Sequence, residues 1–375
     1  MFGKELTVAM IENFGIAFGE PDPTVGDPTV PLQQILAMFK QMNKRGTIFL
    51  PPGDYKIKDT LHIQQPGIAI VGIGKHLASI QLKNDISGPA VKVSAQNCIL
   101  ENLLIDSKGF KAKGGILIER ESIPNITADH CEVRSVGVSS FNIGTTAGDL
   151  PYGIKVNAFY CAIVEPYILE CEKGIVIDRH QNTIYGGSII STSKKPNDTK
   201  PIPRFCGIQI GESYTPNNNT IIGTDIEIRS TRAHIYFDGG WANRFVGIRL
   251  EGTNDNNLIE VKSGGHNHFL ISRASVRQFI VNDPSHTCTF EIAHYDYGYD
   301  EKNNKCLHKK KKNPQVVAQA MPVVPRPGCK EPPLAQDFPV GASVWYSKLN
   351  KPIWSDGKDW RDANGDTVRE YLKAK

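Results

Sequence analysis

The sequence has few tryptophans and methionines, no long apolar run and no excess of charge of one sign. Its 375 residues include 4 Trp and 5 Met, and the net charge is only +4. No stretch approaches the roughly 18 consecutive apolar residues of a transmembrane helix, so we expect no membrane insertion. A dedicated nucleic-acid binder usually carries a marked basic excess, so we expect no nucleic-acid partner.

The chain also lacks the patterns of a secreted protein. No basic segment followed by an apolar one stands at the N-terminus, so no secretory signal is visible. The 8 cysteines include no CxxC pair, and several lie in apolar, strand-like segments, such as Cys98 and Cys206. We interpret them as reduced, buried small side chains, which predicts synthesis in a reducing cytoplasm.

We expect no metal ion and no cofactor. The turn that contains His266 and His268 lacks a third ligand for zinc. The acidic, Asn-rich stretch 254–257 is more typical of a turn than of a calcium loop. No phosphate-binding loop, dinucleotide fingerprint or nucleophile elbow stands in a strand–turn–helix context.

The sequence does contain one helical segment, followed by many short strands. Apolar residues at helical spacing run from Leu32 to Met42, which predicts a helix over 31–44. Pro31 suits its first turn and Gly46 suits its end. From residue 47 onward, short apolar bursts of period two alternate with Gly, Asn, Asp, Ser and Pro, which predicts short β-strands.

The predicted strands repeat in a fixed frame. An apolar burst follows each of Asn182, Asn219, Asn243 and Asn267, and a second frame of bursts precedes them at 174–178, 207–211, 234–238 and 258–262. Units this small bury their apolar side chains only by stacking, which predicts a parallel β-helix. Recurrent Asn at one turn predicts hydrogen bonds along the stack and a left-handed backbone there. A β-propeller would have longer repeats, of about 40–50 residues.

Outward-facing side chains are the candidates for chemistry, because inward positions are apolar. The Asn frame gives three neighbouring outward columns: Ser188, Asp225, Arg249 and Arg273; then Ile190, Glu227, Glu251 and Ser275; then Arg229, Thr253 and Arg277. Adjacent coils lie about 4.8 Å apart. Glu227 and Glu251 would then lie near the roughly 5–5.5 Å separation of a retaining glycosidase. We take Glu227, Glu251, Asp225 and Arg249 as candidate catalytic residues, in which mutual repulsion divides the carboxylates into an acid and an anion.

Two alternatives stay open for these charges. They could form a solvated ion-pair ladder without a catalytic role, in which Arg249 pairs with Asp225 and with both glutamates. Arg249 and Arg273 beside Asp225 would also suit elimination from an acidic sugar. The sequence does not choose between hydrolysis and elimination.

The second frame supplies candidate substrate-binding residues. Its outward columns read Val176, Gln209, Tyr236 and Glu260; then Asp178, Gly211, Asp238 and Lys262. Tyr236, Trp241 and His234 suit a platform on which the apolar face of a sugar stacks. Asp238, together with Arg273 of the first frame, completes the predicted binding set, and Asp178 is a weaker candidate acid.

Two segments resemble a known family. Asn13-Phe14-Gly15, the helical segment and the stretch 46–57 (GTIFLPPGDYKI) resemble the beginning of pectate-lyase-like right-handed β-helix proteins. Near the C-terminus, the pieces 351–354 (KPIW) and 360–363 (WRDA) resemble the short module that ends many bacteriophage and prophage tail-spike proteins.

The resemblance implies an all-β protein, a right-handed single-stranded parallel β-helix with an N-terminal capping helix and a small C-terminal β-hairpin module. It implies a homotrimeric tail spike of the phage virion, made in the host cytoplasm and attached to the tail directly or through an adaptor protein. Such a spike binds and depolymerises a surface polysaccharide of the host bacterium, namely capsule, O-antigen or exopolysaccharide. A non-enzymatic receptor-binding or structural tail protein is one alternative, and a cellular polysaccharide lyase or hydrolase is another.

Four segments follow from these observations. We expect an N-terminal cap at 1–46 and the β-helix at 47–300. A loop and Pro-rich linker is expected at 301–340, before the C-terminal module at 341–375.

Overall fold

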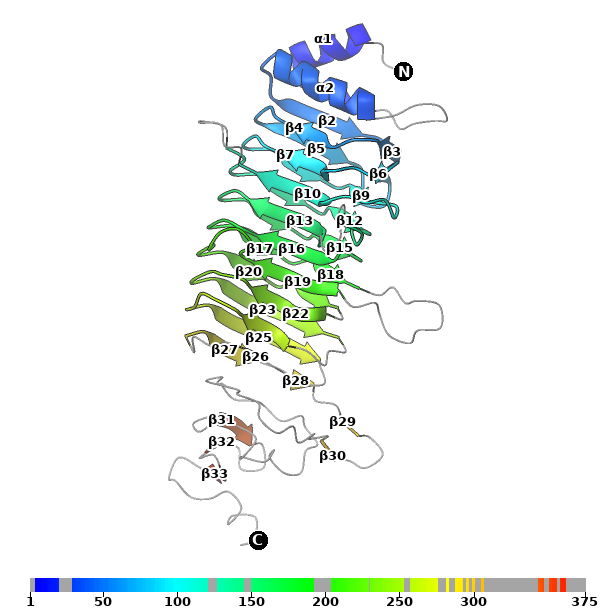
Figure 1. The fold of residues 1–375 in the computed structure, drawn as a ribbon. Helices are drawn as coiled ribbons and strands as arrows, with labels where there is room; N and C mark the ends of the chain where they lie inside the picture. The colour runs from blue at the N-terminus through cyan, green and yellow to red at the C-terminus, as the bar shows by residue number, and fades with distance from the viewer. Residues whose placement is uncertain are drawn as a thin grey trace.

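The computed structural model is a long stack of coils with two short helices at its N-terminal end (Figure 1). It describes residues 4–19, 29–120, 127–144, 150–191, 204–228, 230–252 and 257–275. Shorter described segments follow at 281–282, 287–292, 295–296, 299–300, 305–306, 343–346, 351–355 and 358–361. Neither described helix has the length and apolar character that a membrane crossing requires.

In the part of the chain that the structure describes, two helices lie at the N-terminal end of the stack, on either side of β1. α2 (Thr29–Gln41) confirms the predicted helix, and Phe39 on its apolar face is fully buried. α1 (Lys4–Phe14) is a second helix, so the prediction of a single helical segment was wrong. Its apolar periodicity is short, but Ile11 is fully buried in the core. Gly15 ends α1 with a φ of +63° and donates its N–H to the carbonyl of Ile11 at 3.0 Å.

The strands form three parallel ladders along the stack, because successive coils place their strands side by side in the same order. The first ladder contains β1 (Ile16–Phe18), β2 (Gly46–Leu50), β5 (Ile68–Gly72), β8 (Ile99–Glu101), β11 (Glu132–Arg134), β14 (Ala162–Val164), β17 (Thr183–Tyr185), β20 (Thr220–Ile222), the first halves of β23 (Arg244–Glu251) and β25 (His268–Ser275), and β27 (Thr289–Ile292).

The second ladder follows the first around each coil. It contains β3 (Gly53–Ile57), β6 (Ala78–Leu82), β9 (Leu104–Asp106), β12 (Gly137–Ser139), β15 (Tyr167–Leu169), β18 (Ser188–Ile190), β21 (Asp225–Glu227), the second halves of β23 and β25, and β28 (Tyr295–Asp296).

The third ladder closes each coil. It contains β4 (Leu61–Ile63), β7 (Pro89–Val93), β10 (Gly114–Glu119), β13 (Tyr152–Asn157), β16 (Lys173–Ile177), β19 (Arg204–Ile210), β22 (Ser230–Phe237), β24 (Asn257–Val261) and β26 (Val281–Asn282). Every pairing within the three ladders is parallel, which confirms the predicted parallel β-helix and excludes a propeller.

Inward side chains of the three ladders fill one continuous apolar column. On the first ladder, Ile163, Ile184, Ile221, Phe245 and Phe269 stack in register and are almost completely buried. Full burial of a side chain of this size stabilises the fold by about 1.5–3 kcal/mol relative to exposure. The stack therefore gains stability coil by coil, as the repeat predicted.

A second column, of Cys and Asn, runs along the turn before the first ladder. In order along the stack it reads Cys98, Cys131, Cys161, Asn182, Asn219, Asn243, Asn267 and Cys288. Each of the four Asn side chains accepts a hydrogen bond from the backbone N–H of the residue one coil earlier, at 2.8, 2.7, 3.0 and 3.0 Å. The predicted hydrogen bonding between coils is thereby confirmed.

The left-handed backbone at this turn lies one residue before the Asn column, not at the Asn residues themselves. Gln181, Asn218, Ala242 and His266 have φ of 59°, 56°, 54° and 53°. They reverse the chain, so the following Asn can begin an extended strand with its side chain turned inward. The prediction of left-handed Asn residues was therefore wrong by one position.

The cysteine prediction is confirmed where the structure describes the side chains. Cys98, Cys131, Cys161, Cys171, Cys206 and Cys288 are buried free thiols. The side chains of Cys306 and Cys329 lie outside the described residues.

Beyond the coils, short antiparallel strands follow. β29 (Tyr299–Asp300) pairs with β30 (Lys305–Cys306). β31 (Ser343–Tyr346), β32 (Lys351–Ser355) and β33 (Trp360–Arg361) form a three-stranded antiparallel sheet, which confirms a small hairpin module near the C-terminus. Apart from 305–306, the predicted linker at 301–340 lies outside the described residues.

Candidate functional site

The outward columns of the second ladder have the register that the sequence predicted. Ser188, Asp225, Arg249 and Arg273 are paired in one column, and Ile190, Glu227, Glu251 and Ser275 in the next. The third predicted column, Arg229, Thr253 and Arg277, lies outside the described residues. We call the group of Asp225, Glu227, Arg249, Glu251 and Arg273 the acid face.

Arg249 occupies the centre of the acid face. Its Nη1 lies 3.4 Å from Asp225 Oδ2, and its Nη2 lies 2.6 Å from Glu251 Oε1. Arg273 Nε lies 3.9 Å from the same Glu251 oxygen. Glu251 therefore faces two guanidinium groups, whereas no described side chain forms an ion pair with the exposed Glu227.

The carboxyl groups of the acid face have different environments. Burial raises the pKa of Asp225, and the nearby Glu251 adds to this effect, although Arg249 and Arg273 act against it. The hydrogen bond with Glu251 raises the pKa of Arg249, so Arg249 stays charged. A partly buried carboxyl beside an exposed one is the arrangement that separates an acid from a base.

The predicted role of His234 in a sugar platform is wrong, because this side chain is 0% exposed. His234 continues an inward column of Gly115, Gly153, Gly174 and Gly207, which are aligned by the flanking strand pairs. Its Nε2 lies 2.9 Å from the carbonyl of Glu251. Burial lowers the pKa of His234 to about 4.

Tyr236 keeps its predicted column with Gln209 and Glu260 but is also largely buried. Its ring packs edge-on against Phe205 at 5.7 Å, and the Arg232 guanidinium lies 5.0 Å from the ring centroid. Its hydroxyl donates to Asp238 Oδ1 at 3.4 Å. Tyr236 therefore supports Asp238 and offers little ring surface to a ligand.

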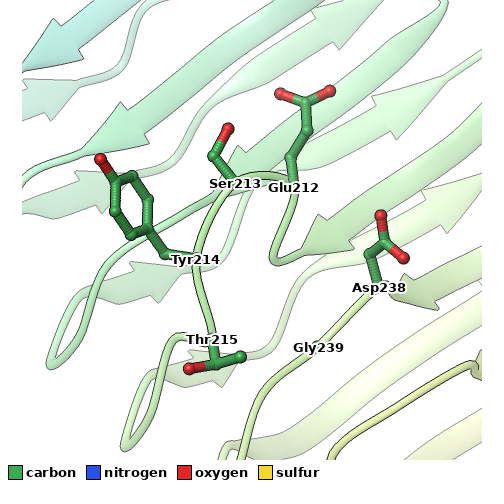
Figure 2. Close-up of a pocket in the computed structure, with 6 residues that line it drawn as sticks. All are labelled: Glu212, Ser213, Tyr214, Thr215, Asp238 and Gly239. Carbon is green, nitrogen blue, oxygen red and sulfur yellow. The ribbon is translucent and has the colours of Figure 1, made fainter.

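Asp238 lines a surface depression of about 460 Å³ beside the loop that follows β19. We call it the corner groove; it is lined by Glu212, Ser213, Tyr214, Thr215, Asp238 and Gly239. Figure 2 shows the loop from Glu212 to Thr215 arching past Asp238 and Gly239. Lys262 Nζ lies 2.6 Å from Asp238 Oδ1, so this carboxylate is ion-paired.

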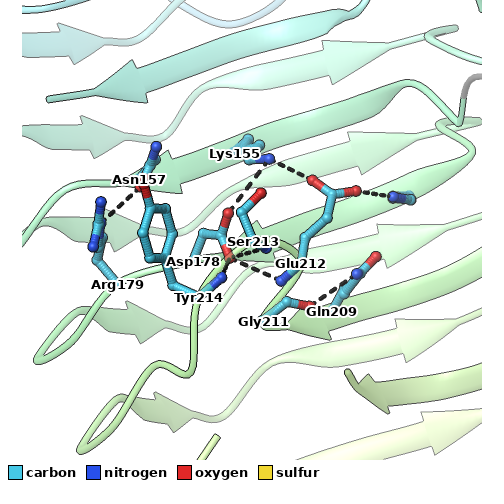
Figure 3. Close-up of polar contacts among 10 residues, drawn as sticks. Lys155, Asn157, Asp178, Arg179, Gln209, Gly211, Glu212, Ser213 and Tyr214 are labelled. Atoms are coloured by element: carbon cyan, nitrogen blue, oxygen red, sulfur yellow. Dashed lines mark hydrogen bonds and ion pairs between the residues drawn. The ribbon is translucent and has the colours of Figure 1, made fainter. Parts of the chain in front are cut away.

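Asp178 builds the loop of the corner groove and is not a free acid. Its Oδ1 accepts backbone N–H groups of Glu212, Ser213 and Tyr214 at 2.8, 2.9 and 3.2 Å (Figure 3). Its Oδ2 lies 3.5 Å from Lys155 Nζ. Asp178 thus fixes the loop that presents Tyr214, and a role as acid has no support in these contacts.

Two lysines bind the carboxylate of Glu212, which the sequence reasoning missed. Lys155 and Lys173 both form ion pairs with it. Burial alone would raise the pKa of Glu212, but the hydrogen bonds from the lysines outweigh burial and lower it. Glu212 lies in a loop outside the period-two pattern, so the repeat gave no signal for it.

Trp241 is exposed, as a binding residue requires. Its backbone forms parallel β-bridges with Asn217 and Gly265 of the adjacent coils, and the residue is 44% exposed. Its ring centroid lies 5.8 Å from that of His266. The structure therefore separates the predicted binding residues: Trp241 lies at the turn before the first ladder, Asp238 in the corner groove and Arg273 on the acid face. Among the described residues, no group of three or more His, Cys, Asp or Glu side chains is arranged to hold a metal ion.

No protein-family model and no curated protein matches the sequence. Solved structures do match in fold. The Dettilon tailspike protein is 14% identical, with a TM-score of 0.50 over 79% of this chain and 64% of its own. Tailspike protein 2 of an Escherichia coli O157:H7 bacteriophage is 13% identical, with a TM-score of 0.49 over 72% of this chain and 41% of its own. DFA-IIIase from Arthrobacter chlorophenolicus is 15% identical, with a TM-score of 0.48 over 76% of this chain and 95% of its own.

The comparison with the Dettilon protein agrees with the fold described above. Together with the three parallel ladders, the likeness to the Dettilon protein shows that this chain is a parallel β-helix of the kind found in phage tailspike proteins. The chain spans less than two thirds of the length of the two tailspike proteins.

Proposed function

We propose that this protein is a homotrimeric phage tail-spike component that binds a surface polysaccharide of the host bacterium and hydrolyses it at the acid face. It would join the virion tail directly or through an adaptor protein. Fold similarity to the Dettilon tailspike protein and the C-terminal motifs support the tail-spike assignment. The observation that carries the hydrolytic assignment is that the partly buried Asp225 carboxyl, whose pKa is raised by burial, lies on the same strand as the exposed carboxylate of Glu227.

In this proposal Asp225 is the general acid and Glu227 the general base. Both lie on β21, two residues apart. Two residues of a strand span about 6.6 Å, which is at the lower end of the roughly 6.5–9.5 Å carboxyl separation of inverting glycosidases. Asp225 would protonate the leaving glycosidic oxygen, while Glu227 would take a proton from the water that attacks the anomeric carbon.

Arg249 and Glu251 have positioning roles in this account. The guanidinium of Arg249 bridges Asp225 and Glu251, so it holds the Asp225 carboxyl in place. Glu251 is already bound by Arg249 and faces Arg273, which leaves it less free than Glu227 to activate water. The pair of Glu227 and Glu251 suggested by the columns is thereby replaced by Asp225 and Glu227.

The test is incubation of the purified protein with capsular, O-antigen and exopolysaccharide preparations, followed by mass analysis of the fragments. Hydrolysis adds one water per cleavage and releases reducing ends. Elimination adds no water and creates an unsaturated sugar that absorbs in the ultraviolet. Light scattering on the same sample tests the trimer. Intact polysaccharide in every reaction, with binding retained, would leave a non-enzymatic receptor-binding protein and contradict the hydrolytic proposal.

A further inference from the structure

Exposed aromatic side chains lie at the turns before the first ladder, outside the acid face. We define the aromatic stripe as Phe159, Tyr160, Arg179, Tyr214, Trp241 and His266. Tyr160 and His266 are the residues with left-handed backbone at the turns of their coils, with φ of 57° and 53°. Phe159 and Trp241 occupy the preceding position, two residues before Cys161 and Asn243 of the buried column. The stack of coils therefore places Phe159 and Trp241 in one column along its axis, and Tyr160 and His266 in the column beside it.

Rings of the stripe contact one another, Arg179 and two histidines outside the stripe, His130 and His180. Tyr160 stacks on His130 with centroids 5.0 Å apart and an angle of 8° between the rings. Phe159 stacks on His180 at 5.6 Å. The guanidinium of Arg179 lies 3.2 Å from the ring centroid of Tyr214 and 5.8 Å from that of Phe159. These contacts hold the rings in place before any ligand binds.

The stripe remains open to solvent despite these contacts. Tyr160 is 51% exposed, and Tyr214 and Trp241 are each 44% exposed. From the coil of Tyr160 to that of His266 there are four coil steps, or about 19 Å at 4.8 Å per step. A ligand that uses the whole stripe must therefore be an extended chain that runs parallel to the axis of the stack.

The chemistry of the stripe favours a carbohydrate chain over a protein surface. Rigid aromatic rings match the apolar faces of pyranose sugars, and polar tips on Tyr and Trp match their hydroxyls. The corner groove beside Tyr214 adds the carboxylates of Glu212 and Asp238 as acceptors for hydroxyl groups. Exposed aliphatic side chains, which suit a protein interface, lie elsewhere: Ile73 and Leu77 are in the turn between β5 and β6.

We propose that the aromatic stripe and the corner groove bind an extended polysaccharide chain along the axis of the coils, at a site separate from the acid face. The class of ligand rests on the proposed function. The acid face lies on the outward side of the second ladder, whereas the stripe lies at the turn from the third ladder to the first. One polysaccharide can thus be held at the stripe while another segment or another chain is cleaved.

The test measures binding of full-length protein to an immobilised array of purified bacterial capsular and O-antigen polysaccharides. The variants are Tyr160→Asn, Tyr214→Ala and Trp241→Ala, because Asn tolerates the left-handed backbone of position 160. Trp241→Phe tests rescue by a smaller ring. Tyr185→Ala is the matched control, since Tyr185 is a 47% exposed tyrosine at the end of β17, away from the stripe.

We expect each of the three stripe variants to weaken binding at least fivefold, while Trp241→Phe and Tyr185→Ala bind like the parent. Tyr185→Ala should also release reducing ends from short oligosaccharides at the parental rate, because Tyr185 belongs to neither the stripe nor the acid face. Binding at parental strength in all three stripe variants overturns the proposal. Dissociation of the oligomer by the stripe variants in sedimentation also overturns it, because the stripe would then be a subunit interface. Stripe-dependent binding without any cleavage supports the stripe and contradicts only the hydrolytic function.

Discussion

Asn243 Oδ1 accepts two hydrogen bonds from Asn219, one from its backbone N–H at 3.0 Å and one from its side-chain amide at 2.9 Å. Asn267 binds Asn243 in the same way, with both distances 3.0 Å. These side chains are fully or almost fully buried. Each amide therefore satisfies buried polar groups of the coil before it, and the column links the coils in the part of the protein that carries the acid face.

Asn219→Ala should lower the free energy of unfolding by at least about 2 kcal/mol, because each buried group left without a partner costs about 1–3 kcal/mol. The backbone N–H of Asn182 loses its acceptor, and Asn243 loses a donor. Chemical denaturation measures the change. Asn218→Gly is the control, because position 218 is exposed and already has a φ of 56°. Equal stability of the two variants would contradict a structural role for the column.

His234 should make stability depend on pH between about 6.5 and 4. Burial lowers its pKa in the folded protein to about 4, so the unfolded chain binds the proton more readily. Neutral, buried His234 therefore makes its full contribution to the free energy of unfolding above pH 6.5. This contribution falls by on the order of 3 kcal/mol as the pH drops from 6.5 to 4. His234→Gln, which cannot titrate, should show a smaller fall in melting temperature from pH 7 to pH 4. Equal falls in parent and variant would show that His234 does not titrate in this way.

The stacked thiols of Cys98, Cys131 and Cys161 should not react in the folded protein. Hydrogen bonding to Cys131 and burial raise the pKa of Cys98, and hydrogen bonding to Cys161 raises the pKa of Cys131 to about 12. A thiolate is the reactive form of cysteine, so Cys98 and Cys131 present little of it near neutral pH. Burial shields all three side chains from a reagent in solution. Iodoacetamide labelling with peptide mapping should modify these three residues only after denaturation. Rapid labelling of the native protein at any of them would contradict their placement.

Glu251→Gln should reduce hydrolysis less than removal of either proposed catalytic carboxyl. The variant keeps an oxygen for Arg249 but loses the charge that binds it, so Arg249 should position Asp225 less well. We expect a fall of about tenfold in kcat, compared with about 10²–10⁴-fold for loss of a general acid or base. Complete loss of activity in Glu251→Gln would instead assign the chemistry to Glu227 and Glu251.

The repeat made the register of the acid face predictable. The intervals between Asn182, Asn219, Asn243 and Asn267 align the coils, and each carboxylate of the second ladder then falls beside its observed neighbour. Within each segment of the second ladder, inward and outward positions alternate, so a pattern of period two was enough there.

The period-two pattern did not predict which side chains point inward where the backbone bends. In β22, His234 takes the inward place that glycines hold in the preceding coils, instead of an outward one. The loop that presents Tyr214 is set by three backbone hydrogen bonds to Asp178, a residue 34 to 36 positions earlier. Such contacts depend on the three-dimensional path of the loop, which neither composition nor periodicity records. The line of Phe159 and Trp241 was accessible from the frame, but only once the Cys residues were read as members of the Asn column.

The most direct test of the account is the hydrolytic rate of Asp225→Asn and Glu227→Gln on the polysaccharide that the parent protein cleaves. Glu132→Gln is the matched control, because Glu132 on β11 is also an outward carboxylate paired with an arginine, Arg134. We expect both acid-face variants to fold and bind polysaccharide but to lose reducing-end release by at least about 10²-fold, while Glu132→Gln keeps the parental rate. Parental activity in either acid-face variant would contradict the assignment of Asp225 as the acid and Glu227 as the base.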